Sequence, residues 1–426
     1  MKPMTGTYEI NYSGEVAEIN QRNYMAFTKV FLNFTVYRLA VNSTFTRARL
    51  GRATIALATA SVASLLCISQ AYGQGCIVAR SNGEQGGPES EGGYLTKGDW
   101  EFGIGYRHQF SYIHFVGPTE QTYRVQNGNQ VENKINLENF NATYQISARF
   151  SVTADIPLLT ASRHTNNSPI IYTSAGIGDS SILAQGWIWD PREKSSGNIQ
   201  LGIGLLVPTG KDNVKNTISS NGVTTTVPVD YSIQPGQGGW GIPWTWVAYK
   251  NWRASQLYFN GSYTMMTKDL GARRSNNNNP LTLTQFNAVT DQYLLEGGVA
   301  HPLAKVHGLT VLFGPRMEGV PARNLLPVGD NLGFRRPGFA VSVEPGIQYA
   351  RDGNVFSFTV ARAIYRDRTR SVPDVLTGGH GDAAFANWVW LASYTFRARH
   401  ADLSHANQAH ANPALPAPTP TRASQL

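Results

Sequence analysis

Charged side chains recur within apolar stretches of this sequence, at positions that alternation would place on a single face. In "QYLLEGGVA", Tyr293, Leu295 and Val299 fall on one face of an extended chain, so Glu296 falls on the other. The same period of two separates further charged residues from their apolar neighbours, and the set is Arg107, Asp155, Glu296, Arg316, Glu318 and Glu344. In a confined polar interior, such groups can select solutes by charge, or they can neutralise one another and stiffen the structure. The sequence leaves both interpretations open.

A serine hydrolase would need a histidine base within reach of a serine hydroxyl. His114, His301 and His307 are the candidate bases, and only His114 is expected near a long loop, with Ser111 three residues before it. An odd separation places the two side chains on opposite faces of a strand, so no nucleophile and base pair is expected. We therefore assign no catalytic residue.

Metal and phosphate sites are also weakly indicated. The segment "LTGGHGDAAF" places His380 close to Asp382, with Asp374 nearby, but the irregular spacing favours a glycine-rich turn capped by an aspartate. The segment "VPTGKDN" contains Gly210 and Lys211 but lacks the spaced glycines and the following helix of a phosphate-binding loop. No metal site and no cofactor are predicted.

The candidate residues are carried by a nearly continuous series of strand-like segments. The pattern is clearest in "NWVWLASYTFR", where Trp388, Trp390 and Phe396 share one face. Most segments are ten to thirteen residues long, which suits a tilted strand that crosses a bilayer. Twelve are predicted, near 99–115, 136–146, 150–160, 177–189, 199–208, 240–249, 255–266, 290–301, 308–319, 338–350, 354–365 and 384–397.

The connections between these segments alternate between long and short. Loops after odd segments are long and rich in Asn, Thr, Gly and Ser, whereas links after even segments, such as 147–149 and 351–353, are tight turns. A soluble sandwich has no reason to sort its loops in this way, but outer-membrane barrels have short periplasmic turns and long outside loops. We predict an all-β fold, a transmembrane antiparallel up-and-down β-barrel of about 12 strands, with both termini periplasmic. A soluble sandwich or barrel is the alternative fold.

Aromatic residues and prolines refine this prediction. Aromatic side chains cluster near strand ends, as in the interfacial girdles of membrane barrels, and Trp187 is one of those expected at the short-turn rim. Pro315 and Pro345 fall inside predicted strands, where a missing N–H implies a bulge or a shifted register. Arg362 falls on the lipid-facing side, which is tolerable only near a rim.

Composition excludes other classes of protein. The chain has 426 residues, 15% of them charged, and no run of 18 strongly apolar residues, which excludes a polytopic helical membrane protein. Residues 1–73 hold seven Lys or Arg and three Glu, so they carry +4 of the formal charge of +8. The remaining net charge, about +4 on residues 74–426, is too small and too dispersed to indicate nucleic-acid binding.

The ends of the chain are predicted to lie outside the barrel. Residues 1–73 are interpreted as a leader with a signal peptide, because arginines precede the apolar stretch 53–68, and Met25 or a later codon is an alternative start. Residues 74–98 form a Gly-rich segment or plug, 99–397 the barrel, and 398–426 a flexible Ala- and Pro-rich tail. Cys67 leaves with the signal, so no intramolecular disulfide is expected.

Three segments resemble a known family. The stretches "GIGDSSILAQGWIW" (176–189), "GIGLLVPTGKDN" (202–213) and "GDAAFANWVWLASYTFR" (381–397) are similar to outer-membrane proteins of the MetA-pathway of phenol degradation family, over about residues 95–397. The resemblance implies a Gram-negative outer-membrane barrel with a role in the passage of small, often aromatic or apolar, compounds. It implies no catalytic residue.

The predicted function is therefore passive passage of small molecules through an outer-membrane channel. The alternatives are a non-conducting structural or adhesive barrel that works through its long loops and, less favoured, an outer-membrane hydrolase. The predicted partners are outer-membrane lipid, small-molecule solutes and the barrel assembly machinery, and no nucleic acid.

Overall fold

A computed structural model describes residues 94–400, except 195, 221 and 275–284. The predicted leader and signal peptide, most of the Gly-rich segment 74–98 and nearly all of the tail therefore lie outside the described residues. Within the part that is described, no helix has the length and apolarity needed to span a bilayer.

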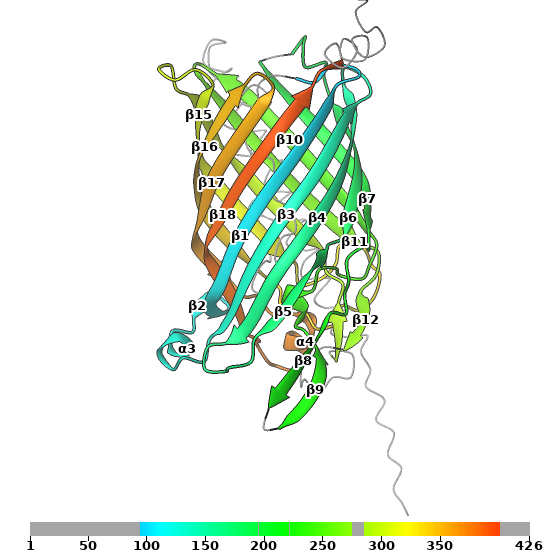
Figure 1. Cartoon of the computed structure of the whole chain (residues 1–426), viewed down its shortest axis with the longest axis vertical. Helices are drawn as coiled ribbons and strands as arrows, with labels where there is room; N and C mark the ends of the chain where they lie inside the picture. The colour runs from blue at the N-terminus through cyan, green and yellow to red at the C-terminus, as the bar shows by residue number, and fades with distance from the viewer. Residues whose placement is uncertain (1–93, 195, 221, 275–284, 401–426) are drawn as a thin grey trace, which may run out of the picture. The chain divides into compact units, whose positions relative to one another are not determined.

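Twelve antiparallel strands form a closed barrel, which confirms the predicted fold (Figure 1). Neighbours in sequence are neighbours in the wall, and the last strand pairs with the first. The strands are β1 (Trp100–Val116), β3 (Val131–Gln145), β4 (Phe150–Thr165), β6 (Ser180–Trp187), β7 (Gly197–Val207), β10 (Gly241–Trp252), β11 (Ser255–Met266), β14 (Gln292–Pro302), β15 (Leu309–Val320), β16 (Gly338–Arg351), β17 (Asn354–Asp367) and β18 (Ala383–Ala398).

The seam between β1 and β18 joins the two ends of the barrel domain. Its register begins at Trp100 opposite Ala398 and ends at Phe115 opposite Ala383, with irregularities on both sides of Ser111. An ion pair crosses the seam, because Arg397 Nε lies 2.5 Å from Glu101 Oε2. The first and last strands are therefore held by backbone hydrogen bonds along most of their length and by the ion pair between Glu101 and Arg397.

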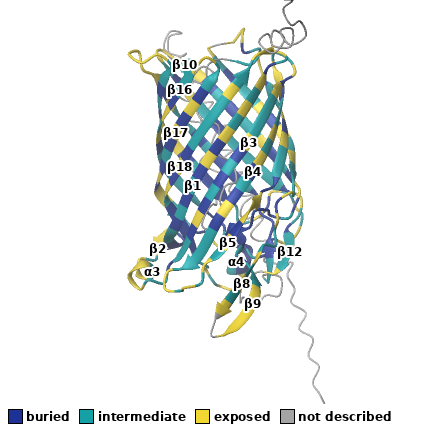
Figure 2. Ribbon diagram, viewed as in Figure 1, coloured by how far each residue is buried: buried dark blue, intermediate teal, exposed yellow. Residues whose placement is uncertain are grey.

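Alternation along the strands creates two different surfaces. Large apolar side chains cover the outer wall, and Trp390 remains 46% exposed while its neighbour Leu391 is 2% exposed on the inside. Figure 2 shows this as alternating exposed and buried positions along the strands. Exposed aromatic and aliphatic residues on nearly every strand form an apolar belt. Contact of this belt with water would be unfavourable, so the belt is suited to contact with lipid.

Three local expectations can be compared with the structure. Trp187 was expected in the outer girdle, but it is buried inside the barrel, where it packs on Tyr249 with ring centroids 6.0 Å apart. The register of β16 against β17 is the same on both sides of Pro345, and the shift in this pair lies between Val341 and Ser342, so the irregularity expected at Pro345 is not observed. Pro315 causes no shift. Its partner strand β14 carries consecutive glycines at that level, which lets the two backbones approach closely.

The long connections gather at one end of the barrel and the short turns at the other (Figure 1). The short turns are 146–149, 188–196, 253–254, 303–308 and 352–353. The long connections contain β2 (Thr119–Glu120), α3 (Tyr123–Gln126), β5 (Tyr172–Ile177), β8 (Lys215–Ser220), β9 (Val223–Pro228), the 3₁₀ helix η1 (Tyr231–Ile233), β12 (Leu270–Arg274), β13 (Phe286–Ala288) and α4 (Val372–Leu376). We call these two ends the long-loop end and the short-turn end.

Candidate functional site: the barrel interior

A cluster of buried ions crosses the interior. Arg107 on β1 donates to Glu318 on β15 through both terminal nitrogens, at 2.9 and 2.5 Å, although three strands separate β1 from β15 in the wall. Arg107 is 0% exposed and Glu318 is 5% exposed. Because these two strands are not neighbours, the pair extends across the interior instead of along the wall.

Arg316 extends this cluster toward two more carboxylates. Its Nη1 lies 3.0 Å from Glu296 and 3.5 Å from Glu344, and its Nε lies 3.2 Å from Glu318. Thr359 donates its hydroxyl to the other oxygen of Glu344. Five of the six residues predicted from alternation are thus in one network of two guanidinium and three carboxylate groups. We call this network the ionic cluster.

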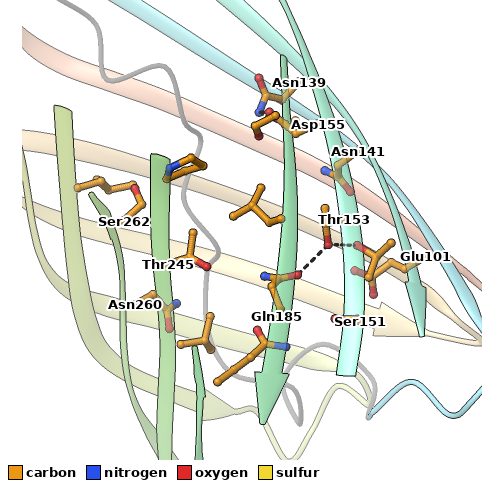
Figure 3. Close-up of a pocket in the computed structure, with 18 of the residues that line it drawn as sticks. Glu101, Asn139, Asn141, Ser151, Thr153, Asp155, Gln185, Thr245, Asn260 and Ser262 are labelled. Carbon is orange, nitrogen blue, oxygen red and sulfur yellow. Dashed lines mark hydrogen bonds between the residues drawn. The ribbon is translucent and has the colours of Figure 1, made fainter. Parts of the chain in front are cut away.

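The sixth predicted residue, Asp155 on β4, is not in the ionic cluster. Asn139 on β3 donates its side-chain amide to both carboxylate oxygens, at 2.9 and 3.1 Å. Asp155 and Asn139 lie side by side at the wall of the interior cavity (Figure 3). Among the described residues, no cationic side chain is paired with Asp155.

The cavity has a volume of about 360 Å³ and is bounded by side chains from strands all around the barrel. Most of these are neutral hydrogen-bonding groups, as Figure 3 illustrates with Asn141, Thr153, Gln185, Thr245, Asn260 and Ser262. Some are already linked to each other, because Thr153 donates to Gln185 at 2.7 Å. The interior is therefore polar, although the outer wall is apolar.

Tyr94 and Leu95 also line this cavity. The Tyr94 ring packs against Trp187 and Tyr249, with centroid distances of 5.9 and 6.4 Å, and its hydroxyl contacts that of Tyr249. Both partners lie near the short-turn end of their strands. The chain thus reaches the barrel interior before β1 begins.

Residues 229–238, which we call the inward segment, fold against the inner wall. Ile233 is 0% exposed and packs among buried side chains of β3 and β4 that include Ile135, Leu137 and Leu159. Asp179 holds the segment in place by accepting hydrogen bonds from the backbone N–H groups of Gly210 and Gln237, at 3.1 and 2.8 Å. Sequence analysis did not predict this segment, because its composition is that of an ordinary polar loop.

The motifs at 176–189 and 202–213 meet at the base of the inward segment. A Cβ atom on Gly210 would lie 2.6 Å from the Cα atom of Gly236, so the two backbones touch there. Thr209 donates its hydroxyl to the carbonyl of Gly178 at 2.6 Å. Gly210 of the PTG stretch therefore joins the inward segment to the wall.

Partly buried ion pairs also hold the long-loop end. Arg336 donates to both oxygens of Asp230 at 2.8 and 2.9 Å, and Arg163 lies 3.5 Å from the same carboxylate. Burial by itself would raise the pKa of Asp230, but the two arginines and the Ser232 N–H hold that pKa well below its usual value. This carboxylate therefore stays charged at pH values where an ordinary aspartate begins to be protonated, and its ion pairs keep the inward segment in place there.

The prediction that Ser111 and His114 lie on opposite faces of their strand was wrong. Ser111 and His114 were expected on opposite faces, but the irregular register around Ser111 leaves both buried. His114 Nδ1 lies 2.8 Å from Asp382, and its Nε2 accepts the Val131 backbone N–H at 2.8 Å. Both ring nitrogens are therefore used within the described structure. This histidine therefore links β1 to Asp382 and to the backbone of β3.

Comparisons with known proteins give structural likenesses only. The sequence matches no family profile and no curated protein. The COG4313 outer membrane channel from Pseudomonas putida F1 is 11% identical, with a TM-score of 0.48, and the match covers 74% of this chain and all of that one. The β domain of the Bordetella autotransporter BrkA is 10% identical, with a TM-score of 0.37, over 70% of this chain and 99% of that one. The Pseudomonas putida toluene transporter TodX is 11% identical, with a TM-score of 0.34, over 71% of this chain and 91% of that one. Likenesses at this level concern the fold alone.

Proposed function

We propose that this protein is a passive outer-membrane channel for small molecules. The observation that carries the proposal is a polar interior cavity enclosed by a barrel whose outer wall is apolar. A wall of this kind fits lipid, and a cavity lined by amides and hydroxyls fits hydrated or hydrogen-bonding solutes. No catalytic residue is part of the proposal.

The proposal includes the location and the partners predicted from the sequence. It places the barrel in the outer membrane of a Gram-negative cell, with both termini periplasmic and the long loops outside. Folding there would require the barrel assembly machinery. The resemblance to the MetA-pathway family supports the same location, and Tyr94 in the cavity supports a plug-like role for the segment 74–98.

Conductance separates the channel from its alternatives. Purified full-length protein in planar bilayers should give stepwise conductance in potassium chloride. A barrel that reaches the bilayer, is folded and never conducts would favour the second candidate, a closed structural barrel. The observation in favour of that candidate is the ionic cluster, which crosses the interior from β1 to β15.

The orientation can be tested with single cysteines in a chain whose two native cysteines are replaced by serine. Val223, at the tip of the β8 and β9 hairpin, is 65% exposed, and Asp352 lies in a short turn with its side chain 83% exposed. An impermeant maleimide should label Val223→Cys on intact cells and should label Asp352→Cys only after lysis. The opposite pattern would reverse the proposed orientation.

We also propose that the ionic cluster influences ion selectivity. Its five members carry two positive and three negative formal charges, so they sum to −1. Glu296→Gln and Glu344→Gln are each expected to shift the reversal potential toward anions in a salt gradient, because each removes one negative charge from the ionic cluster in the interior. Reversal potentials that equal the wild-type value in both variants would leave the cluster with a purely structural role.

A further inference from the structure

We infer that Asp155 and Asn139 form a binding site in the barrel interior for a small primary ammonium compound that carries at least one further N–H or O–H donor. The inference rests on the proposed channel function, and it names a solute class for the cavity. The site lies on β3 and β4 at the wall of the cavity (Figure 3), and among the described residues no hydrogen bond or ion pair connects it to the ionic cluster.

Asp155 differs from the other carboxylates that line the cavity. Glu101 pairs with Arg397 at 2.5 Å, Glu296 pairs with Arg316 at 3.0 Å, and Asp179 accepts two backbone N–H bonds. Among the described residues, Asp155 is held only by the neutral amide of Asn139. A carboxylate in a confined cavity is stabilised by a cation, and here the cation would have to come from the solute.

The side-chain oxygen of Asn139 is the second observation that points to a ligand. Both of its hydrogen bonds to Asp155 use the side-chain nitrogen, which fixes the amide so that its oxygen is turned away from the carboxylate. That oxygen has no partner in the described structure, although Asn139 is only 8% exposed. Gln348, which lines the same cavity and is 3% exposed, likewise has an unpartnered amide oxygen. Buried acceptors without donors are costly, so these atoms favour a ligand rich in donors.

A carboxylate without a cation, together with buried acceptor oxygens, limits the class of ligand that fits the site. A primary ammonium group can give Asp155 charge-assisted hydrogen bonds and still direct another N–H toward a neighbouring acceptor. A quaternary ammonium has the charge but no N–H, and a hydrocarbon would leave the acceptors unpaired. An anion would be repelled by Asp155.

Equilibrium binding to the full-length protein, folded in detergent micelles, tests the site independently of conduction. The probes are 2-aminoethanol and choline, which carry the same charge and a hydroxyl but differ in N–H donors. The wild type should bind 2-aminoethanol roughly tenfold more tightly than choline, a ratio that corresponds to about 1.4 kcal/mol. Asp155→Asn should reduce binding of 2-aminoethanol to the level of choline.

Glu101→Gln is the matched control, because it removes one negative charge from the same cavity at a carboxylate that already has a cation. It should keep the preference for 2-aminoethanol. Equal binding of the two probes by the wild type, or an equal loss in both variants, would overturn the inference. Asp155→Ser serves as a second variant if Asp155→Asn does not give a folded, heat-modifiable barrel.

The result can be separated from the test of the channel. Saturable binding of 2-aminoethanol that depends on Asp155, in a protein without conductance, would support the site and contradict the channel. Stepwise conductance in a protein that does not distinguish the two probes would support the channel and contradict the site.

Discussion

Replacing Arg316 with alanine is expected to lower the free energy of unfolding by about 3–5 kcal/mol, the range found when one member of a buried ion pair is removed. Arg316 is 1% exposed and contacts Glu296, Glu318 and Glu344. Its loss would leave three buried carboxylates with less compensation, although Arg107 still pairs with Glu318. The measurement is the urea midpoint of the folded, heat-modifiable form in detergent micelles.

The control for this prediction is an ion pair at the surface. Arg351 pairs with Asp352 at 3.2 Å, and both side chains are more than two-thirds exposed. Arg351→Ala should leave the urea midpoint close to the wild-type value, because exposed ion pairs contribute little to stability. Adding Glu344→Gln to Arg316→Ala should recover part of the loss. A stable Arg316→Ala variant would mean that water already compensates these carboxylates.

Placing two aspartates on the outer wall is expected to block assembly of the barrel. Phe358 and Trp390 lie on the adjacent strands β17 and β18, are 41% and 46% exposed, and have ring centroids 6.0 Å apart. If this wall faces hydrocarbon, Phe358→Asp with Trp390→Asp should cost on the order of 2–3 kcal/mol at each position, besides the lost aromatic contact. The fraction of heat-modifiable protein in the outer-membrane fraction measures the effect.

Thr395→Asp is the matched control for the outer-wall variant. It introduces an acid on the same strand β18, but on the side that lines the cavity. This variant should assemble to nearly the wild-type level. Equal assembly of the outer-wall double variant would show that this face does not meet lipid.

The sequence predicted the strands well because one physical signal repeats along them. Trp388, Trp390 and Phe396 share a face in the sequence pattern and on the outer wall, since strand periodicity depends only on neighbours in the chain. Lengths of loops are equally local, so the long-loop end was also predictable. The error at Trp187 arose because an aromatic at a strand end can face either side, and here Tyr94 fills the space beside it inside the barrel.

The contacts between inward-facing side chains were less predictable from the sequence than the strands were. Alternation placed Glu296, Arg316 and Glu344 on the inner face of three consecutive strands, and Arg316 on the middle strand does contact both carboxylates. Alternation cannot show that Arg107 reaches Glu318 across the interior, because that contact depends on the diameter and stagger of the barrel. The inward segment was missed for a similar reason, since its burial depends on contacts with β3 and β4 that lie far away in the sequence.

The seam between β1 and β18 has a consequence for how the protein folds. The residues that form its ion pair, Glu101 and Arg397, are separated by 296 positions, so the seam is the contact that costs the most chain entropy to form. Until it forms, β1 and β18 each present an edge of unpaired N–H and C=O groups, and such edges cannot remain in hydrocarbon. For a barrel that folds in lipid, as proposed, entry into the bilayer and closure of the ring are therefore expected to proceed together.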